Sequence, residues 1–265
     1  MEILNKYRNW LLVNGRSANT AKNYISQVNR FLQAVDIQDI TETSISDYLL
    51  ECQEEYSNET INVHRASIIS FLEFLKLDIN LPKRLPETSK LPECITEEDF
   101  INKVIPVIKK MPEDLRLKAL LYFMFYSGVR KSELMTLKRS DFDFDNLEVI
   151  IREKKTKKER IGTFNDTTRV FVQKYFISST ENNNAFNISS LSVLDRTFQE
   201  IEQSLDGINF YPHILRHGCA TMLLRKGVDL RRVKKLMGHG NIQTTMRYLT
   251  VTDKDAIEEY HRKVK

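Results

Sequence analysis

The sequence predicts a mainly α-helical chain of two domains, with one small antiparallel β-sheet in the second domain. Over most of the 265 residues, apolar side chains recur every three or four positions, which is the period of a helix buried on one side. Two short β-like runs, 147–152 and 160–164, flank a basic turn and indicate a hairpin. A proline-rich stretch at 81–92 separates the two parts of the chain.

The first domain is expected to be a bundle of four short helices. Three of the expected helices cover residues 4–13, 41–56 and 58–77, and the other follows Ser17 and carries the apolar repeat from Tyr24 to Val35. Ser17 precedes the second helix and is the expected N-cap, because a serine hydroxyl can accept a hydrogen bond from a first-turn N–H. Three prolines within 11 residues then predict an extended linker. We therefore expect domains at 1–80 and 95–265, joined by a linker at 81–94.

The second domain is expected to combine helices with the hairpin. Thr96 is followed three residues later by Asp99, a pattern typical of a capped helix start. Residues 115–127 are so apolar that their helix should be buried on all sides. Gly128 is expected to end this helix, a further helix is expected at 129–137, and the chain from 166 onward is expected to be helical.

Composition excludes several classes of protein. No run approaches the roughly 18 to 20 apolar residues that a membrane helix needs, and the N-terminus lacks the pattern of a signal peptide. The three cysteines, at 52, 94 and 219, are too few and too far apart for a disulfide framework or a metal knuckle. We expect a cytoplasmic protein with no membrane partner and no cofactor.

The charge is unevenly distributed. The net charge of +4 divides into −2 over residues 1–90 and +6 over residues 91–265. Two basic runs, 152–160 and 225–235, each contain six Lys or Arg residues. They favour a polyanionic partner, with nucleic acid the leading candidate, although two solvated surfaces would give the same pattern.

Residues 211–221 contain the first candidate for chemistry. Pro212 suits the first turn of a helix, and that helix places His213 and Arg216 side by side as i and i+3. Arginine offers a planar fork to a phosphate, and histidine can donate a further hydrogen bond. His213 and His217 also have an i, i+4 spacing that can ligate zinc, but Ile214 replaces the glutamate of a metalloprotease helix, so zinc is disfavoured.

Two further segments carry candidate residues. Arg130 follows the helix-breaking glycine at the start of a helix, a position that suits anion binding, and Glu133 three residues later could hold it. A structural Arg–Glu pair is the alternative. His239 lies in a Gly-His-Gly-Asn turn, and Tyr248 follows nine residues later.

Taken together, these segments resemble the tyrosine recombinases, also called phage-type integrases or Xer-type recombinases. SGVRKSEL at 127–134, HILRHGCAT at 213–221 and LMGHGNIQTTMRYL at 236–249 resemble three family boxes in order and spacing. The spacing of Ser17, Thr20, Tyr24 and Phe31 resembles the opening of the family's core-binding domain. The resemblance covers nearly the whole chain and implies a four-helix, SAM-like domain and an α+β catalytic domain that form a clamp around DNA.

The resemblance also implies roles for individual residues. Tyr248 matches the nucleophile, and Glu133 matches a partner that orients the first arginine. The other matches to catalytic residues are Arg130, Lys155, His213, Arg216 and His239. Lys155 is chosen because it lies five residues before Arg160, the basic residue that opens the second strand. The basic runs supply the expected DNA contacts: Lys154, Lys157, Lys158, Arg160, Arg231 and Arg232.

The implied activity is metal-independent, site-specific recombination through a 3′-phosphotyrosyl intermediate and a Holliday junction. Four protomers would assemble on two DNA sites, with a monomer or dimer when free and accessory proteins as possible further partners. The segment 253–265 would pack on a neighbouring protomer. A type IB topoisomerase, which would act as a monomer, and a DNA-binding protein that has lost catalysis are the two alternatives.

Overall fold

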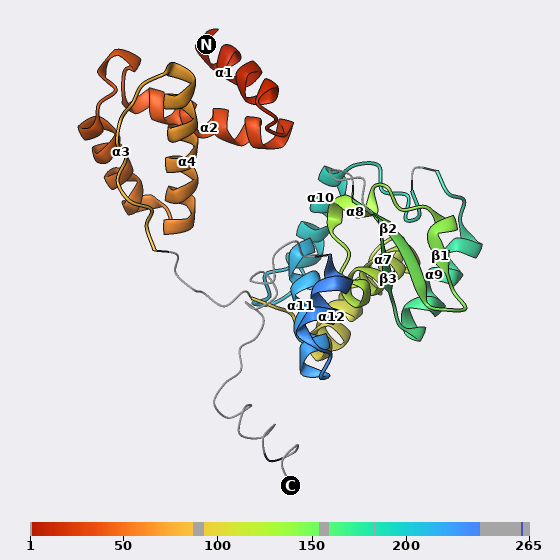
Figure 1. Cartoon of the computed structure of the whole chain (residues 1–265). Helices are drawn as coiled ribbons and strands as arrows, with labels where there is room; N and C mark the ends of the chain where they lie inside the picture. The colour runs from red at the N-terminus through yellow and green to blue at the C-terminus, as the bar shows by residue number, and fades with distance from the viewer. Residues whose placement is uncertain (1, 87–92, 154–158, 183, 239–260, 262–265) are drawn as a thin grey trace. The chain divides into compact units, whose positions relative to one another are not determined.

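The chain divides into two compact units, residues 1–90 and 91–265 (Figure 1). The computed structural model describes residues 2–86, 93–153, 159–182, 184–238 and 261. Both units are mainly helical, and the second contains a three-stranded antiparallel sheet. The predicted fold class is therefore confirmed. Over the described residues, no helix is long and apolar enough to cross a membrane.

The first unit contains the four expected helices. They are α1 (Glu2–Val13), α2 (Ala18–Ala34), α3 (Glu42–Glu55) and α4 (Asn58–Leu75), with a short 3₁₀ turn, η1 (Ile37–Asp39), between α2 and α3. The expected N-cap is confirmed, because the Ser17 hydroxyl accepts from the N–H of Thr20. Their buried faces form one core that includes Tyr7, Phe31 and Phe71.

Residues 81–86 fall in the stretch expected to be linker, yet they pack against the first unit. The side chain of Asn62 on α4 pairs with the backbone of Leu85 in both directions, at 2.9 and 3.0 Å. Asn58 donates to the carbonyl of Pro86 at 2.8 Å, and Leu81 and Leu85 lie against the helical core. A buried amide such as that of Asn62 needs such partners.

The second unit is built around α7 (Asp114–Ser127). Its other helical segments are α5 (Glu97–Asp99), η2 (Phe100–Val104, a π turn), α6 (Ile105–Ile108), α8 (Lys131–Leu134), η3 (Arg139–Asp141, 3₁₀), α9 (Asp166–Ser178), α10 (Leu191–Glu202), α11 (Pro212–Arg225) and α12 (Leu230–Met237). Nine of the 14 residues of α7 are buried, as its long apolar run predicts. The helix packs against α9 and α11.

The connection after α7 differs from the prediction. Gly128 ends α7 in the left-handed conformation, with φ +59°. A helix at 129–137 was expected, but α8 covers only 131–134. Arg130 is extended and acts as its N-cap, and the carbonyl of Leu137 accepts a hydrogen bond from Ala185 at 2.7 Å, which draws the chain away from the helix axis.

The predicted hairpin is present as β2 (Glu148–Arg152) and β3 (Glu159–Thr163), and a short β1 (Phe142–Asp143) extends the sheet on the other side of β2. In the register, Ile151 pairs with Arg160 and Ile150 pairs with Ile161. Ile151 is buried whereas Ile161 is 61% exposed, so the two faces of the hairpin differ sharply. Because directly paired residues lie on the same face of a sheet, Arg160 lies on the buried face.

The last described helix, α12, lies beside α11 (Figure 1). Val233 and Met237 of α12 pack on Cys219 and Ala220 of α11 and form a small apolar cluster. Gly238 ends α12 in the left-handed conformation, with φ +63°.

Candidate active site

The candidate site is assembled around the C-terminal end of α12. Arg216 projects from α11 and is only 4% exposed. One guanidinium nitrogen, Nη1, donates to the carbonyl of Gly128, and the other, Nη2, donates to the carbonyl of Met237 at 2.5 Å. Arg216 therefore connects the end of α7 with the end of α12.

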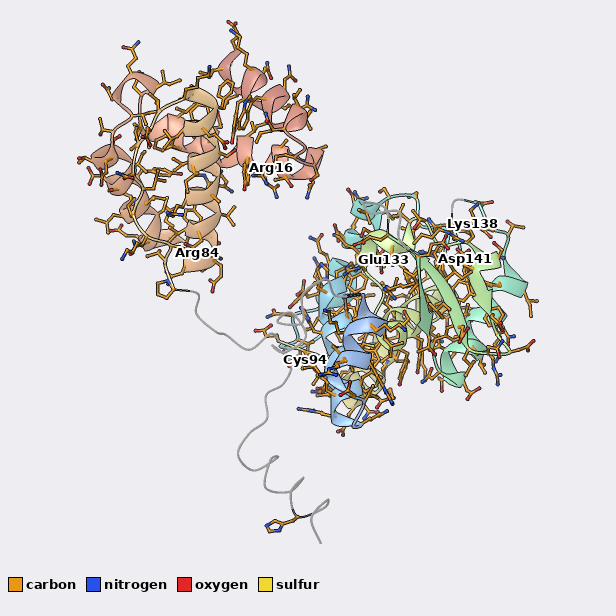
Figure 2. All side chains as sticks on the ribbon, in the orientation of Figure 1. Arg16, Arg84, Cys94, Glu133, Lys138 and Asp141 are labelled. Atoms are coloured by element: carbon orange, nitrogen blue, oxygen red, sulfur yellow. The ribbon has the colours of Figure 1, made fainter. Side chains whose placement is uncertain are left out.

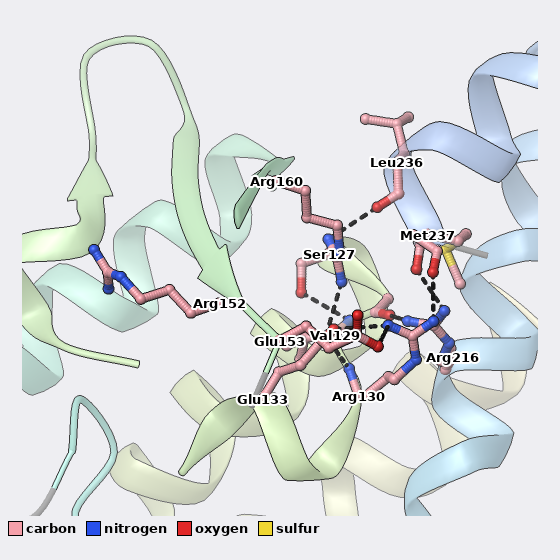
Figure 3. Close-up of polar contacts among 12 residues, drawn as sticks. Ser127, Val129, Arg130, Glu133, Arg152, Glu153, Arg160, Arg216, Leu236 and Met237 are labelled. Carbon is pink, nitrogen blue, oxygen red and sulfur yellow. Dashed lines mark hydrogen bonds and ion pairs between the residues drawn. The ribbon is translucent and has the colours of Figure 1, made fainter. Parts of the chain in front are cut away.

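Arg130 also donates to a backbone carbonyl at the C-terminal end of α12. Its Nη2 donates to the carbonyl of Gly238, and its Nη1 donates to Oε1 of Glu133 at 2.8 Å (Figure 3). Arg130 and Arg216, which are far apart in the sequence, thus donate to the carbonyls of two consecutive residues. The side chain of Arg130 is 26% exposed, whereas that of its partner Glu133 is 2% exposed.

Glu133 is the carboxylate at the centre of this cluster. It belongs to the second unit (Figure 2), and its burial is nearly complete, with 2% exposed. Besides the guanidinium of Arg130, it accepts the backbone N–H of Arg130 at 2.8 Å and Nη2 of Arg160 at 2.8 Å. The expected orienting contact between Glu133 and Arg130 is present, and Arg160 joins it from β3.

Arg160 was expected to contact DNA, but its guanidinium points inward. Nη2 donates to Glu133, Nη1 donates to the carbonyl of Leu236 at 2.9 Å, and the side chain is 16% exposed. Burial lowers the pKa of Arg160, and the negative charge of Glu133 opposes that shift. The basic run in the sequence does not indicate this orientation. The strand register does indicate it, because Arg160 lies opposite the buried Ile151.

The three arginines donate to backbone carbonyls at the same helix end, the C-terminal end of α12. The carbonyls of Leu236, Met237 and Gly238 accept from Arg160, Arg216 and Arg130 respectively. The last carbonyls of a helix lack intrahelical partners and carry partial negative charge, so cations are stabilised there. Three guanidiniums thereby gather at one helix end, and only two of them, Arg130 and Arg160, also contact the buried carboxylate of Glu133, which leaves a positively charged site suited to a phosphate.

Two histidines line the exposed side of α11. His213 is solvent-accessible, and partial removal from water with the positive charges of Arg216, Lys131 and Arg130 lowers its pKa. Burial, together with His213 and Arg216, lowers the pKa of His217 to about 4, so His217 is neutral at physiological pH. Within the part of the chain that the structure describes, no group of three His, Cys, Asp or Glu side chains could hold a metal ion.

The remaining predicted site residues fall into two groups. Arg231 and Arg232 are exposed in the first turn of α12, where Asp229 caps the helix by accepting from both of their N–H groups. The others lie outside the described residues: Lys154, Lys155, Lys157, Lys158, His239 and Tyr248. Gly238, the acceptor of Arg130, directly precedes His239 in the sequence.

Two family models match the chain. The model of the phage integrase family matches residues 95–255, and that of the phage integrase N-terminal SAM-like domain matches residues 4–78. The chain belongs to the phage integrase family. Its described catalytic-box residues, Arg130, His213 and Arg216, all lie within the matched region.

This integrase-family chain has relatives that match it almost from end to end. Tyrosine recombinase XerA of Thermococcus onnurineus is 30% identical over 264 residues, which cover 95% of this chain and 91% of the relative. Tyrosine recombinase XerD of Oceanobacillus iheyensis is 29% identical, with 93% of each protein covered. The resemblance noted in the sequence is therefore confirmed.

Solved structures share the fold of this integrase-family chain at lower identity. The Tn1549 transposon integrase in complex with a circular intermediate DNA matches with a TM-score of 0.76 and 19% identity, over 98% of this chain and 99% of that one. A lambda integrase tetramer bound to a Holliday junction matches with a TM-score of 0.75 and 16% identity, over 92% of this chain and 75% of that one.

Proposed function

We propose that this protein is a site-specific tyrosine recombinase that cuts and rejoins double-stranded DNA through a covalent 3′-phosphotyrosyl intermediate and a Holliday junction. The observation that carries this proposal is the convergence of Arg130 and Arg216 on consecutive carbonyls at the end of α12. Two guanidiniums fixed that close together can both reach the oxygens of one phosphate. The tyrosine recombinases among its relatives support the reaction.

The reaction assigns a role to each residue. The oxygen of Tyr248 attacks the scissile phosphorus as its phenolic proton passes to a neighbouring base or to water, a P–O bond to tyrosine forms, and the bond to the 5′ oxygen breaks. Negative charge grows on the nonbridging oxygens, where Arg130 and Arg216 stabilise it. His213 and His239 supply further hydrogen bonds.

Lys155 completes the proposed set by donating a proton to the departing 5′ oxygen. The phosphotyrosyl bond conserves the energy of the broken phosphodiester, so the strand can be rejoined without ATP. Every role is filled by a side chain, and we accordingly propose a metal-independent mechanism.

The proposed assembly follows the relatives. Four protomers bind two recombination sites, and each clamps the duplex between a core-binding domain at the N-terminal end of the chain and a catalytic domain at the C-terminal end. A monomer or dimer in the absence of DNA, accessory proteins and a cytoplasmic location belong to the same proposal. The lambda integrase structure provides an example of a tetramer on a Holliday junction.

The test is a suicide DNA substrate whose nicked strand is lost after cleavage, which traps the covalent adduct. Wild-type protein should form the adduct equally with and without EDTA. Tyr248→Phe should form none while binding DNA almost as tightly, because a single oxygen is removed. Tyr260→Phe is the matched control and should react normally. An adduct on Tyr248→Phe would place the nucleophile elsewhere, and loss of the wild-type adduct in EDTA would refute metal independence.

A further inference from the structure

We propose that Arg160 is a positioning residue of the recombinase site: it fixes Glu133 and the end of α12, so that Arg130 is aimed at the scissile phosphate. This inference rests on the proposed function and extends it to a residue outside the matched catalytic set. It replaces the expectation that Arg160 contacts DNA.

The strand position of Arg160 is the first observation. On β2 and β3, the residues that pair across the buried face are Ile151 with Arg160 and Val149 with Gly162. Arg160 thus occupies a position that alternation would give to an apolar side chain. A charged group is placed on the buried face of a sheet only where polar partners offset the loss of its hydration.

Those partners belong to two other elements. Nη2 of Arg160 donates to Glu133 on α8, and Nη1 donates to the carbonyl of Leu236 on α12 (Figure 3). The remaining nitrogen, Nε, is buried and has no acceptor among the described residues. A guanidinium that connects β3, α8 and α12 in this way has little surface left for a DNA phosphate.

The two partners of Arg160 also control Arg130. Arg130 is held by Glu133 and by the carbonyl of Gly238. Arg160 binds the same carboxylate, and it binds α12 two residues before Gly238. Loss of Arg160 would therefore loosen both of these hydrogen-bonded attachments at once and leave Arg130 its longer ion pair with Glu153, at 3.7 Å. Misplacement of a catalytic group by about 1 Å can slow a reaction roughly 100-fold.

Arg160 packs closely against the backbone of Gly238 at the end of α12. A Cβ atom on Gly238 would lie 2.7 Å from Nε and 2.8 Å from Cδ of Arg160. Such contacts are closer than real Cβ atoms show, so a side chain at 238 must displace the guanidinium. This provides a way to move Arg160 without removing its charge.

The first experiment compares two substitutions of Arg160 with a control on the same hairpin. Cleavage of the suicide substrate is measured in single turnover at saturating protein, and DNA affinity is measured separately. We expect Arg160→Ala to cleave about 100-fold more slowly with little change in affinity. Arg160→Lys should remain at least 10-fold slow, because a single ammonium lacks the planar fork that reaches both partners.

Arg152→Ala is the matched control, because it removes the same charge from the neighbouring strand. Arg152 forms its ion pairs with Asp141 at 2.7 Å and with Glu159 at 2.9 Å, and it points away from the cluster (Figure 3). Its cleavage rate at saturating protein should stay within about twofold of wild type, since any electrostatic effect on binding is removed by saturation.

The second experiment keeps Arg160 and displaces it. Gly238→Ala should slow cleavage in the manner of Arg160→Ala. Gly227→Ala is its control, because Gly227 also has positive φ, +82°, but a Cβ there meets nothing within 4 Å. Gly227→Ala therefore reports backbone strain alone. If Arg160→Ala does not fold, Arg160→Lys and Gly238→Ala decide the question.

The outcomes separate this inference from the proposed function. If Arg160→Ala or Arg160→Lys cleaves at the wild-type rate at saturating protein and loses only salt-sensitive affinity, Arg160 is a DNA contact and the inference is wrong. A wild-type rate for Gly238→Ala would also overturn it. Failure of the wild-type protein to form a Tyr248 adduct would instead refute the proposed function.

Discussion

At the scale of single residues, the site depends on buried charges that compensate one another. Glu133 has almost no contact with water, and it is held by three N–H donors, two from Arg130 and one from Arg160. Such a carboxylate is tolerated because its ionised form is fully hydrogen-bonded. The stability of the second unit and the geometry of the site therefore depend on the same side chain.

Replacing Glu133 with glutamine tests this dependence. Glu133→Gln keeps the size but removes the charge and turns one acceptor into a donor that faces guanidinium N–H groups. Removing one partner of a buried ion pair costs about 3–5 kcal/mol, so we expect the free energy of unfolding in urea to fall by about 3 kcal/mol. Asp166→Asn, at an exposed pair with Arg169, is the control and should cost less than about 1 kcal/mol. Equal effects would contradict the central role of Glu133.

His217 gives a pH-dependent prediction. Its pKa falls from 6.5 to about 4 in the folded protein, because burial and the neighbouring His213 and Arg216 disfavour the charged ring. The unfolded chain therefore binds more protons, and the stability contributed by the neutral ring is present above pH 6.5 and is lost as the pH falls toward 4. Between pH 7 and pH 5, the free energy of unfolding of His217→Gln should decline less than that of wild type. Parallel declines would show that His217 keeps an ordinary pKa.

At the scale of helices and strands, the two helix ends beside the site are fixed by glycine. Gly128 closes α7 and Gly238 closes α12, both with positive φ, and the carbonyls at these ends accept from Arg216 and Arg130. A Cβ atom on Gly128 would lie 2.5 Å from Sδ of the buried Met237. The close approach of α7 and α12 thus requires glycine at this position.

We therefore expect Gly128→Ala to lower the free energy of unfolding by more than backbone strain alone would. A left-handed alanine costs roughly 1–2 kcal/mol, and overpacking against Met237 adds about 1–3 kcal/mol. Gly207→Ala is the matched control, because Gly207 has φ +65° and no atom within 4 Å of an added Cβ. Urea unfolding and cleavage rates should separate the two variants. If they were equally stable, the contact between α7 and α12 would be looser than the structure indicates.

Much of the element order could be predicted from the sequence, because helical periodicity and capping are local signals. The apolar run of α7, the caps at Ser17 and Thr96, and the hairpin are present as predicted. The extent of α8 was overestimated, since the chain after it is held by the contact between Leu137 and Ala185, which are distant in sequence.

For the candidate site, the sequence predicted which residues take part but not how their side chains are arranged. Motif spacing located Arg130, Glu133, His213 and Arg216, but it carries no information on side-chain direction. Arg160 ends a dense basic run, and only the strand register shows that it faces inward. The shared acceptor at the end of α12 depends on tertiary packing, which no local pattern encodes.

At the scale of the whole molecule, each unit has its own main hydrophobic core among the described residues, and the second unit adds the small cluster between α11 and α12. The core of the first unit is formed by residues from Tyr7 to Leu72, with Leu81 and Leu85 packed against it. The main core of the second unit begins at Ile95. Each unit has the buried apolar side chains that independent folding requires. The stability of an isolated first unit then depends on whether it includes residues 81–86.

We expect a fragment of residues 1–90 to unfold cooperatively in urea and to be more stable than a fragment of residues 1–80. The shorter fragment lacks Leu81 and Leu85, and it leaves the amide of Asn62 without the backbone of Leu85. The two lost hydrogen bonds of Asn62 at about 1 kcal/mol each, with two half-buried leucines, suggest a loss of about 3 kcal/mol. The exposed hydrogen bonds from Asn58 to Pro86 and from Arg65 to Pro82 are lost as well and should add little. Asn62→Ala in the longer fragment should reproduce only the hydrogen-bond share of that loss. Equal urea midpoints for the two fragments would instead show that residues 81–86 do not stabilise the first unit. The domain boundary would then lie at residue 80.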